Sequence, residues 1–257
     1  MKSERCKENK QPIEERIKNF KEVGRGLDQQ DAVLEALRCL QCKKPLCING
    51  CPVGINIPGF INKIAEKDFI SAIKILKDKN MLPGICGRVC PQESQCERFC
   101  VLGKNTQPIA IGLLERFAAD IQKKDRPSLL SSNKKKDASI AVIGSGPAGL
   151  TCAAELAKNG YRATVFESLH LPGGVLRYGI PEFRLPKDIV DEEIEFVKAL
   201  GVEICTDMII GKTLMIEDIR DMGYKAIFIG VGAGLPSFLG VPGENLLGVY
   251  SANEFLT

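Results

Sequence analysis

The chain has 257 residues, 44% of them hydrophobic, and its 35 Lys and Arg residues against 32 Asp and Glu residues give a net charge of +3. This balance excludes a disordered or fibrous protein and is typical of a globular one. The longest uncharged apolar stretch, residues 138–154, is interrupted by glycines and is shorter than the roughly 20 residues that cross a bilayer, so we expect no membrane partner. Since one domain takes about 100–200 residues, the length predicts two domains.

The compartment and the partner class follow from the charge pattern. The first residues, MKSERCKENK, are charged and have no apolar stretch behind them, which predicts a cytoplasmic protein without a secretory signal. Positive charge is concentrated in residues 1–137, but the lysines are spread over several amphipathic stretches and aromatic residues make up only 6% of the chain. We therefore expect no nucleic-acid partner.

Residues 1–125 have the pattern of helices and turns. Apolar residues recur at spacings of three and four in Asp31–Leu37, Phe60–Ile64 and Phe69–Leu76, which predicts short amphipathic helices. No alternating strand pattern precedes Ser139. We expect an all-α domain over residues 1–125, followed by a polar linker over residues 126–137.

Cysteine is concentrated in this first domain, where eight of the 11 cysteines lie between positions 39 and 100. In a reducing compartment such density indicates metal ligation rather than disulfides. The run C-x2-C-x4-C-x3-C-P is similar to the ferredoxin run C-x2-C-x2-C-x3-C-P, in which the fourth cysteine ligates a second cluster. By that analogy we expect two 4Fe-4S clusters, one held by Cys39, Cys42, Cys47 and Cys100, the other by Cys51, Cys90 and Cys96.

The spacing leaves the fourth ligand of the second cluster open, with Cys86 as the simple candidate. Two zinc sites of four thiolates each are the competing interpretation, but zinc favours paired C-x2-C motifs and only one occurs here. The remaining cysteines, Cys6, Cys152 and Cys205, are expected to act as small buried hydrophobic residues.

Residues 138–257 change in character. β-rich runs at 140–144, 163–167, 202–205 and 226–232 alternate with helical patterns at 148–158, 189–200 and 216–222. Strands that alternate with helices predict a parallel sheet of βαβ units. The second domain is therefore expected to be an α/β domain.

A dinucleotide-binding fingerprint follows the first of these strands. Gly144, Gly146 and Gly149 form G-x-G-x-x-G, with Pro147 and Ala148 opening the helix, so that a pyrophosphate can lie at the helix N-terminus. Glu167 ends the second strand and is placed to bind a ribose 2′-OH, which disfavours NADPH at this site. The spacing itself leaves FAD and NAD(P) open.

Both motifs together resemble the N-terminal part of the glutamate synthase small (β) subunit family, from CLQCKKPLCINGCP through IGSGPAGL to GGVLRYGIPEFRLPK and VGAG. Related arrangements occur in dihydropyrimidine dehydrogenase and in the large subunit of NADH-dependent ferredoxin:NADP oxidoreductase. The resemblance implies a multidomain protein, with an α-helical ferredoxin-like iron–sulfur domain followed by a Rossmann-like domain that binds FAD. The implied FAD contacts, besides the fingerprint and Glu167, are Gly173, Gly174, Leu176, Arg177, Tyr178, Gly179, Gly232, Ala233 and Gly234.

The resemblance also implies that a side-chain oxygen completes the second cluster. Glu115 in AIGLLERFA occupies the matching position, which would leave Cys86 unligated. No residue is expected to act as nucleophile or general base, and His170 is expected to be an ordinary loop residue.

The resemblance further implies an electron-transfer oxidoreductase subunit that takes electrons from NADP(H). In complete members they pass through FAD and the clusters to the glutamate synthase large subunit or another flavin or iron–sulfur subunit. The sequence ends at SANEFLT, so we expect an FAD-binding domain incomplete at its C-terminus and no NADPH domain. The alternatives are a bifurcating NADH-dependent ferredoxin:NADP oxidoreductase subunit and a non-catalytic electron-relay or docking module.

Overall fold

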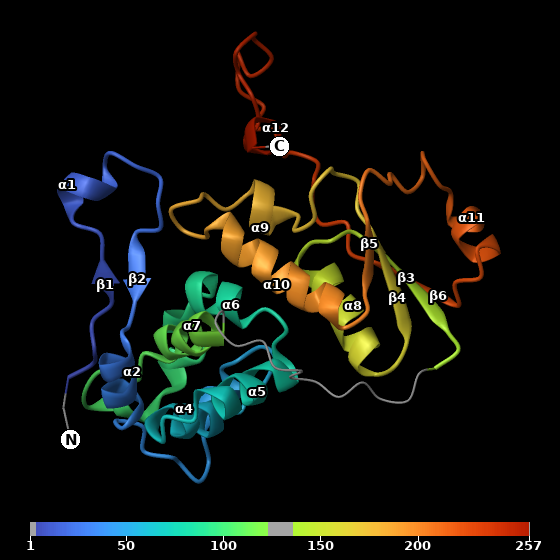
Figure 1. Ribbon diagram of the computed structural model, residues 1–257. Coiled ribbons are helices and arrows are strands. Elements are labelled where there is room, and N and C mark those ends of the chain that lie inside the picture. Colours follow the sequence, from blue (N-terminus) through green and yellow to red (C-terminus); the bar gives the residue numbers. More distant parts are fainter. Residues whose placement is uncertain (1–3, 123–135, 257) are drawn as a thin grey trace. The chain divides into compact units, whose positions relative to one another are not determined.

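The computed structural model describes residues 4–122 and 136–256 (Figure 1). The chain divides into two compact units, which we call the helical unit (residues 1–129 and 182–193) and the sheet unit (residues 130–181 and 194–257). The predicted linker, residues 126–137, lies outside the described residues except for its last two.

The helical unit is built from short helices, as predicted. They are α1 (Ile13–Arg16), α2 (Gln29–Ala36), α3 (Leu46–Asn49), α4 (Ile57–Ala65), α5 (Phe69–Lys79), α6 (Pro83–Val89) and α7 (Ile111–Gln122), with 3₁₀ helices at Gln92–Ser94, Glu97–Phe99 and Val101–Lys104. The expectation that this part is all-α is not met. The strands β1 (Asn9–Lys10) and β2 (Gly24–Gly26) pair antiparallel. They are too short to show an alternating pattern, and Gly24 is held by its carbonyl, which accepts a hydrogen bond from Arg116 at 3.0 Å.

Polar side chains fix where three of these helices begin. Asp28 accepts a hydrogen bond from the backbone N–H of Asp31 at the start of α2, and Asn56 and Asp68 cap α4 and α5 in the same way. Such caps satisfy N–H groups that have no partner within the helix. The three helices therefore start where the sequence supplies a short polar side chain.

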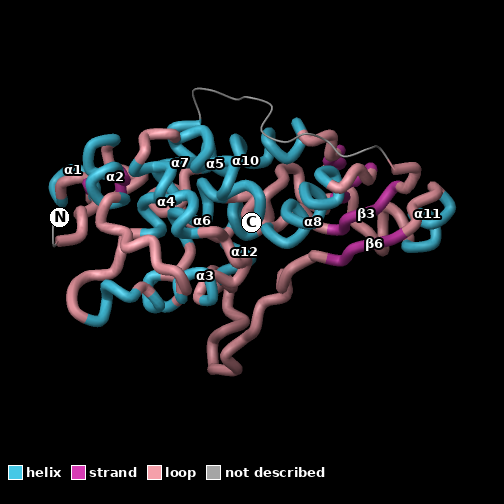
Figure 2. The backbone as a smooth tube through the Cα atoms, turned by 90° about the horizontal axis from the view of Figure 1, so that it is seen from below, coloured by secondary structure: helices cyan, strands magenta, loops and turns pink. Residues whose placement is uncertain are grey.

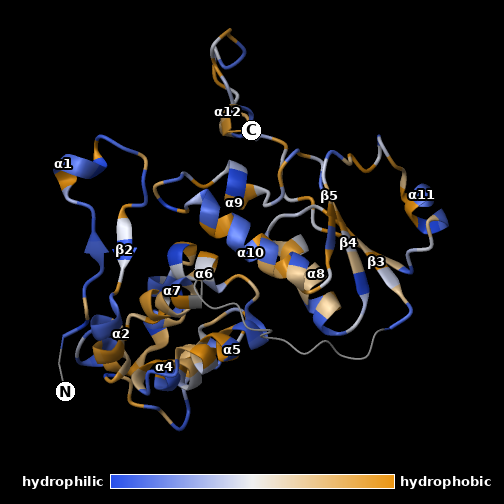
Figure 3. Cartoon of the chain, viewed as in Figure 1, coloured by the Kyte–Doolittle hydropathy of each residue, from blue (hydrophilic) through white to orange (hydrophobic). Residues whose placement is uncertain are grey.

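The core of the helical unit lies between α2, α4, α5 and α7. Helix α4 buries Ile57, Phe60, Ile61 and Ile64, which recur at helical spacing along one face. Figure 3 shows the hydrophobic residues of α4 and α5. This core supports the cysteines that follow α2 and lie in α3.

The sheet unit contains the strands β3 (Ser139–Ile143), β4 (Arg162–Phe166), β5 (Glu203–Cys205) and β6 (Ala226–Ile229). They form one parallel sheet in the order β5-β4-β3-β6. Its helices are α8 (Pro147–Lys158), α9 (Val175–Tyr178), α11 (Ile216–Asp221) and α12 (Ala252–Leu256), while α10 (Lys187–Ala199) has residues in both units. Figure 2 shows the long loop between β6 and α12. The parallel sheet confirms the predicted α/β domain.

The strand order places a topological switch point beside β3. The chain adds β4 and β5 on one side of β3 and then β6 on the other. In open parallel sheets, ligands bind at the carboxyl ends of the strands at such a point. The glycine fingerprint directly follows β3 and so lies at this position.

No helix of the described residues is long and apolar enough to cross a membrane.

Candidate functional site

The first predicted set of thiols surrounds one pocket in the helical unit. Its empty space is about 400 Å³, part of it open to solvent. Apolar residues such as Ile57, Ile61 and Ile109 form much of the remaining wall. The pocket brings together the four predicted ligands Cys39, Cys42, Cys47 and Cys100.

Burial and mutual repulsion act on these thiols. Burial, with the neighbouring Cys100 and Cys39 adding to its effect, raises the pKa of Cys47 to about 11. The pKa of Cys39 is raised chiefly by burial, with Cys100 and Cys42 adding to it. Thiolates are the ligating form of cysteine, so four of them at this place need a positively charged group between them. Backbone N–H groups also face the sulfurs, and that of Ile109 lies 3.5 Å from Cys100 Sγ.

The second predicted set lies around helices α6 and α7. The pKa of Cys96 is raised to about 12 by burial and by the nearby charges of Glu97, Glu115 and Cys51. Cys90, at the end of α6, is close enough to Glu115 to raise the pKa of that carboxyl. Cys51, Cys90, Cys96 and Glu115 are thus linked in pairs, each close enough to another for its charge to act on it.

Glu115 and Cys86, the two candidates for the fourth ligand, both lie beside Cys90. Glu115 is 6% exposed, and burial raises its pKa to about 8. The side chain of Cys86 is hydrogen-bonded to Cys90, which raises the pKa of Cys86 and lowers that of Cys90 to about 7. Asn80 contacts both Glu115 and Cys86. Proximity to Cys90 does not separate the two candidates.

The donor groups fit a cluster better than a single ion. Within residues 4–122 and 136–256, no three His, Cys, Asp or Glu side chains lie close enough together to hold one metal ion as they stand. Thiolates around one zinc ion lie about 4 Å apart, because each Zn–S bond is about 2.3 Å. A 4Fe-4S cluster is wider and would take four thiolates or a mixed set, one ligand for each iron. Four thiols around a partly open apolar pocket match that requirement.

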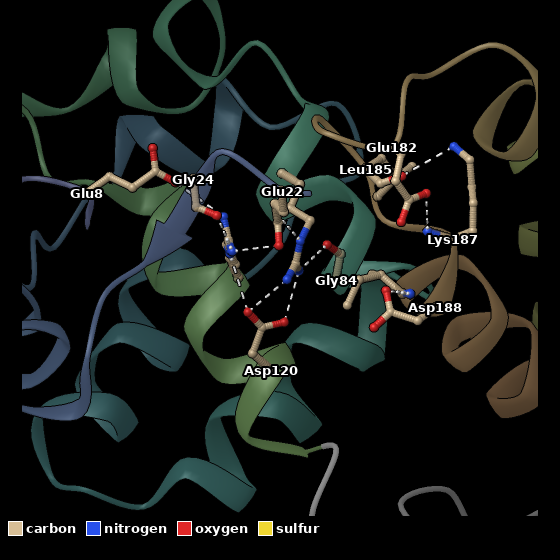
Figure 4. A network of polar contacts seen from close by, with 12 residues as sticks. Glu8, Glu22, Gly24, Gly84, Asp120, Glu182, Leu185, Lys187 and Asp188 are labelled. Atoms are coloured by element: carbon tan, nitrogen blue, oxygen red, sulfur yellow. Dashed lines mark hydrogen bonds and ion pairs between the residues drawn. The ribbon is translucent and has the colours of Figure 1, made fainter. Parts of the chain in front are cut away.

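Arginines that the sequence analysis did not single out hold α6 and α7 together. Arg88 on α6 and Arg116 on α7 both bind Glu22 and Asp120, and Arg116 also binds Glu8, at distances of 2.8–3.3 Å. Figure 4 shows Asp120 and Glu22 converging in this network, with Glu8 and Gly24 beside them. Apart from Arg116 and Asp120, which are four residues apart on α7, the partners are far apart in the sequence, so no local pattern could have revealed the network. It fixes the two helices that carry Cys86 and Glu115.

In the sheet unit, each fingerprint glycine has a distinct steric environment. Gly144 has φ +96°, a conformation that favours glycine, and a β-carbon there would lie 2.5 Å from the carbonyl oxygen of Gly230. A β-carbon on Gly149 would overlap the carbonyl oxygen of Gly144. A β-carbon on Gly146 would meet nothing within 4 Å, so open space lies where a pyrophosphate is expected. Pro147 and Ala148 form the first turn of α8.

Glu167 is buried and binds the glycine loop. Its Oε2 accepts hydrogen bonds from the Ser145 backbone N–H at 2.8 Å and from the Ser145 hydroxyl. Its Oε1 accepts from the Leu169 backbone N–H at 2.9 Å. The Ser145 hydroxyl in turn accepts from the Gly173 backbone N–H at 2.9 Å. The carboxylate that was expected to meet a ribose therefore joins the glycine loop to the loop that follows β4.

Gly173 and Gly174 form a second glycine loop, which lies against the fingerprint loop that begins at Gly144. A β-carbon on Gly174 would come within 2.9 Å of Gly146 Cα. Leu176 is buried, Arg177 donates to the Pro172 carbonyl at 3.0 Å, and Tyr178 lies 3.3 Å from His170 Nδ1. The segment over residues 173–179 therefore lies close to the fingerprint.

The last predicted cofactor contacts follow Gly230 and Val231, which lie against Gly144. Gly232, Ala233 and Gly234 belong to the exposed loop after β6, and a β-carbon on Gly232 or Gly234 would meet nothing within 4 Å. Cys6 is buried, as expected, whereas Cys152 and Cys205 are only partly buried.

Each half of the chain matches a known protein family. Residues 16–127 match the family model described as dihydropyrimidine dehydrogenase domain II, 4Fe-4S cluster, and residues 142–187 match an NAD(P)-binding Rossmann-like domain. The chain is 36% identical over 252 residues to the glutamate synthase [NADPH] small chain of Halomonas elongata, covering 96% of this chain and 52% of that protein. The small chain of Escherichia coli K12 is 35% identical over 249 residues, with the same coverage.

The chain is a homologue of the glutamate synthase small chain. It spans about half the length of these curated relatives. A further relative, the NAD-dependent dihydropyrimidine dehydrogenase subunit PreT of Escherichia coli O157:H7, is 37% identical over 211 residues, covering 80% of this chain and 51% of PreT. This chain thus contains an iron–sulfur domain followed by a Rossmann-like domain.

Proposed function

We propose that this chain is the flavin and iron–sulfur part of an NADPH-dependent oxidoreductase of the glutamate synthase small-subunit type. The observation that carries the proposal is the pocket lined by Cys39, Cys42, Cys47 and Cys100. Residues 1–125 would hold two 4Fe-4S clusters, and residues 126–137 would link them to an FAD-binding domain over residues 138–257. The protein would act in the cytoplasm.

The chain's own residues would do two things. In the helical unit, the thiols would hold the clusters, and backbone N–H groups such as that of Ile109, which donates to Cys100 Sγ, would tune the reduction potential. In the sheet unit, the start of α8 offers N–H groups and a positive helix end to a pyrophosphate. FAD, when bound, accepts a two-electron equivalent and releases electrons singly, and the clusters carry single electrons.

NADPH oxidation and the delivery of electrons to a large subunit belong to the complete protein. We propose the glutamate synthase large subunit as the partner, because two small chains of that enzyme are 35–36% identical to this chain over 96% of its length. A dihydropyrimidine dehydrogenase-type partner is the second candidate, favoured by the 37% identity to PreT.

Anaerobic purification followed by counting of iron, sulfide and flavin tests the proposal. We expect about eight irons and eight sulfides per chain, since each cluster holds four of each, and one FAD after reconstitution. Zinc in place of iron, or a protein that stays colourless after anaerobic reconstitution with iron, sulfide and FAD, would contradict it. Mixing the reduced protein with each candidate partner and following reoxidation then distinguishes the two partners.

A further inference from the structure

Glu97 lies between two cysteines that belong to different predicted clusters. It begins the short 3₁₀ helix Glu97–Phe99, which Cys96 of the second set precedes and Cys100 of the first set follows. The Glu97 carbonyl accepts a hydrogen bond from the Cys100 backbone N–H at 3.0 Å. Its side chain is buried, with only 6% of its surface exposed. A buried carboxylate therefore lies at the turn that connects the two sets of thiols.

Both oxygens of this carboxylate have partners from other parts of the chain. Oε2 forms an ion pair with Arg5 Nη1 at 2.6 Å, and Oε1 accepts a hydrogen bond from the Gly112 backbone N–H at 3.2 Å. Gly112 is in the first turn of α7, where backbone N–H groups have no partner within the helix. The Arg5 backbone N–H donates to Gln107 Oε1 at 3.1 Å. These contacts hold the carboxylate of Glu97 in one place.

The two charges of this ion pair differ in their surroundings. Glu97 is the direct neighbour of Cys96, and its negative charge helps to raise the pKa of that thiol. The Arg5 side chain is 28% exposed, so water screens its charge more than it screens the charge of Glu97. A group bound at Cys96 would therefore experience the negative charge of the pair more strongly than the positive one.

The reduction potential of an iron–sulfur cluster depends on the charges and hydrogen bonds around it. The reduced form carries one more negative charge than the oxidised form, so a nearby carboxylate disfavours reduction. We propose that Glu97 lowers the reduction potential of the second cluster relative to that of the first, and that Arg5 limits this effect. The inference rests on the proposed iron–sulfur function. The charge of Glu97 biases an electron toward the first cluster.

Variants that remove one charge at a time test the inference. Glu97→Gln has nearly the same shape and can still accept from Gly112, so we expect both clusters to be retained and the midpoint potential of the second to become more positive. Arg5→Gln leaves the carboxylate without its cation, so the same potential should become more negative, by a smaller shift. The double variant should fall between the wild type and Glu97→Gln, because the two shifts oppose each other.

Redox titration followed by electron paramagnetic resonance measures the potentials, and iron and sulfide analysis measures cluster content. A Cys90→Ser variant changes one proposed ligand of the second cluster and so identifies its signal. The first cluster is the internal reference, and its potential should change less than that of the second in each variant. Glu66→Gln, which removes the exposed partner of Lys63, is the matched control and should shift neither potential.

The sign of the shifts separates an electrostatic role of Glu97 from a purely structural one. The inference is overturned if Glu97→Gln leaves the potential of the second cluster unchanged or lowers it, or if Arg5→Gln shifts that potential in the same direction as Glu97→Gln. If Glu97→Gln loses iron, the direction of the shift in Arg5→Gln decides alone. A wild-type protein without two clusters would instead contradict the proposed function.

Discussion

Gly87 lies at the closest approach of α6 and α7. A β-carbon there would come within 2.5 Å of the backbone nitrogen of Arg116 and 2.7 Å of its Cα. Alanine favours a helix over glycine by about 1 kcal/mol, but forcing two packed backbones apart costs about 1–3 kcal/mol. We expect Gly87→Ala to lower the free energy of unfolding by up to about 2 kcal/mol and to reduce iron retention.

The matched control is Gly103→Ala, in the same unit. Its β-carbon would lie 3.6 Å from the nearest atom of Pro108, which is an ordinary contact. Urea denaturation and iron analysis of both variants measure the difference. Equal stability of the two variants would show that α6 can move away from α7 without cost.

The hydroxyl of Ser145, in the fingerprint loop, accepts a hydrogen bond from the Gly173 backbone N–H and so connects this loop to the second glycine loop. Ser145→Ala leaves the Gly173 backbone N–H without its acceptor, and a buried unsatisfied donor costs about 1–3 kcal/mol. We expect the affinity for FAD to fall by about tenfold or more, since 1.4 kcal/mol corresponds to a factor of ten. Flavin titration followed by fluorescence measures it.

Ser168→Ala serves as the control for Ser145→Ala. The exposed Ser168 hydroxyl donates to the other oxygen of Glu167, at 3.1 Å. Its removal leaves both glycine loops joined, so flavin affinity should stay within a factor of about two to three. A loss of affinity in both variants would mean that the orientation of Glu167, rather than the contact with Gly173, controls binding.

Helix α2 is held in place by a buried ion pair. Glu35 is 0% exposed and Arg38 is 4% exposed. Arg38 Nη1 lies 2.6 Å from Glu35 Oε1. Glu35 also accepts from the backbone N–H groups of Cys6 and Ala110, so it fastens the N-terminal segment and the start of α7. Removing one partner of a buried pair leaves the other charge uncompensated.

We expect Glu35→Ala to lower the free energy of unfolding by about 3–5 kcal/mol, because Arg38 then stays buried without its partner. Glu15→Ala breaks the exposed pair with Arg25 and should cost at most about 1 kcal/mol. Urea denaturation of both variants provides the comparison. A small effect at position 35 would show that water enters and solvates Arg38.

The start of α5 gives the helical unit a pH dependence. The side-chain and backbone hydrogen bonds of Ser71 lower the pKa of Asp68, which caps the helix, below its usual value of 3.8. Its contribution to stability is therefore present above that value and is lost as the pH falls through the lower pKa of the folded state.

Asparagine caps helices as well as aspartate but does not titrate. We expect Asp68→Asn to lose less stability than the wild type between about pH 5 and pH 3. Urea midpoints of the two proteins at these pH values are the measurement. Parallel losses in both proteins would mean that Asp68 has the same pKa in the folded and unfolded states.

For the whole molecule, the sequence predicted the elements with strong periodicity. The helix expected over Ile216–Met222 ends at Asp221, and the strand expected over residues 140–144 spans Ser139–Ile143. The strand expected over residues 226–232 stops at Ile229 because β3 provides partners only as far as Ile143. The strands β1 and β2 were missed because two and three residues are too few to show an alternating pattern.

The site was predictable where spacing carries chemistry. The cysteine spacing, together with the analogy to ferredoxin, was sufficient to group the four thiols that surround one pocket. Glu97 and Ser145 could not be found in this way, since each acts through partners that only the folded chain brings near. Glu167 shows a further limit, because its position was correctly associated with the fingerprint but its hydrogen bonds to Ser145 were not foreseen.

The position of β6 in the sheet has a practical consequence. Among the described strands it pairs only with β3, and Ile229 and Val231 at its end are each 64% exposed. An open strand edge with apolar side chains is a template on which further chains can add. Concentrated samples of this polypeptide should consequently form oligomers that scatter light, and a lysine in place of Ile229 should keep them clear for longer.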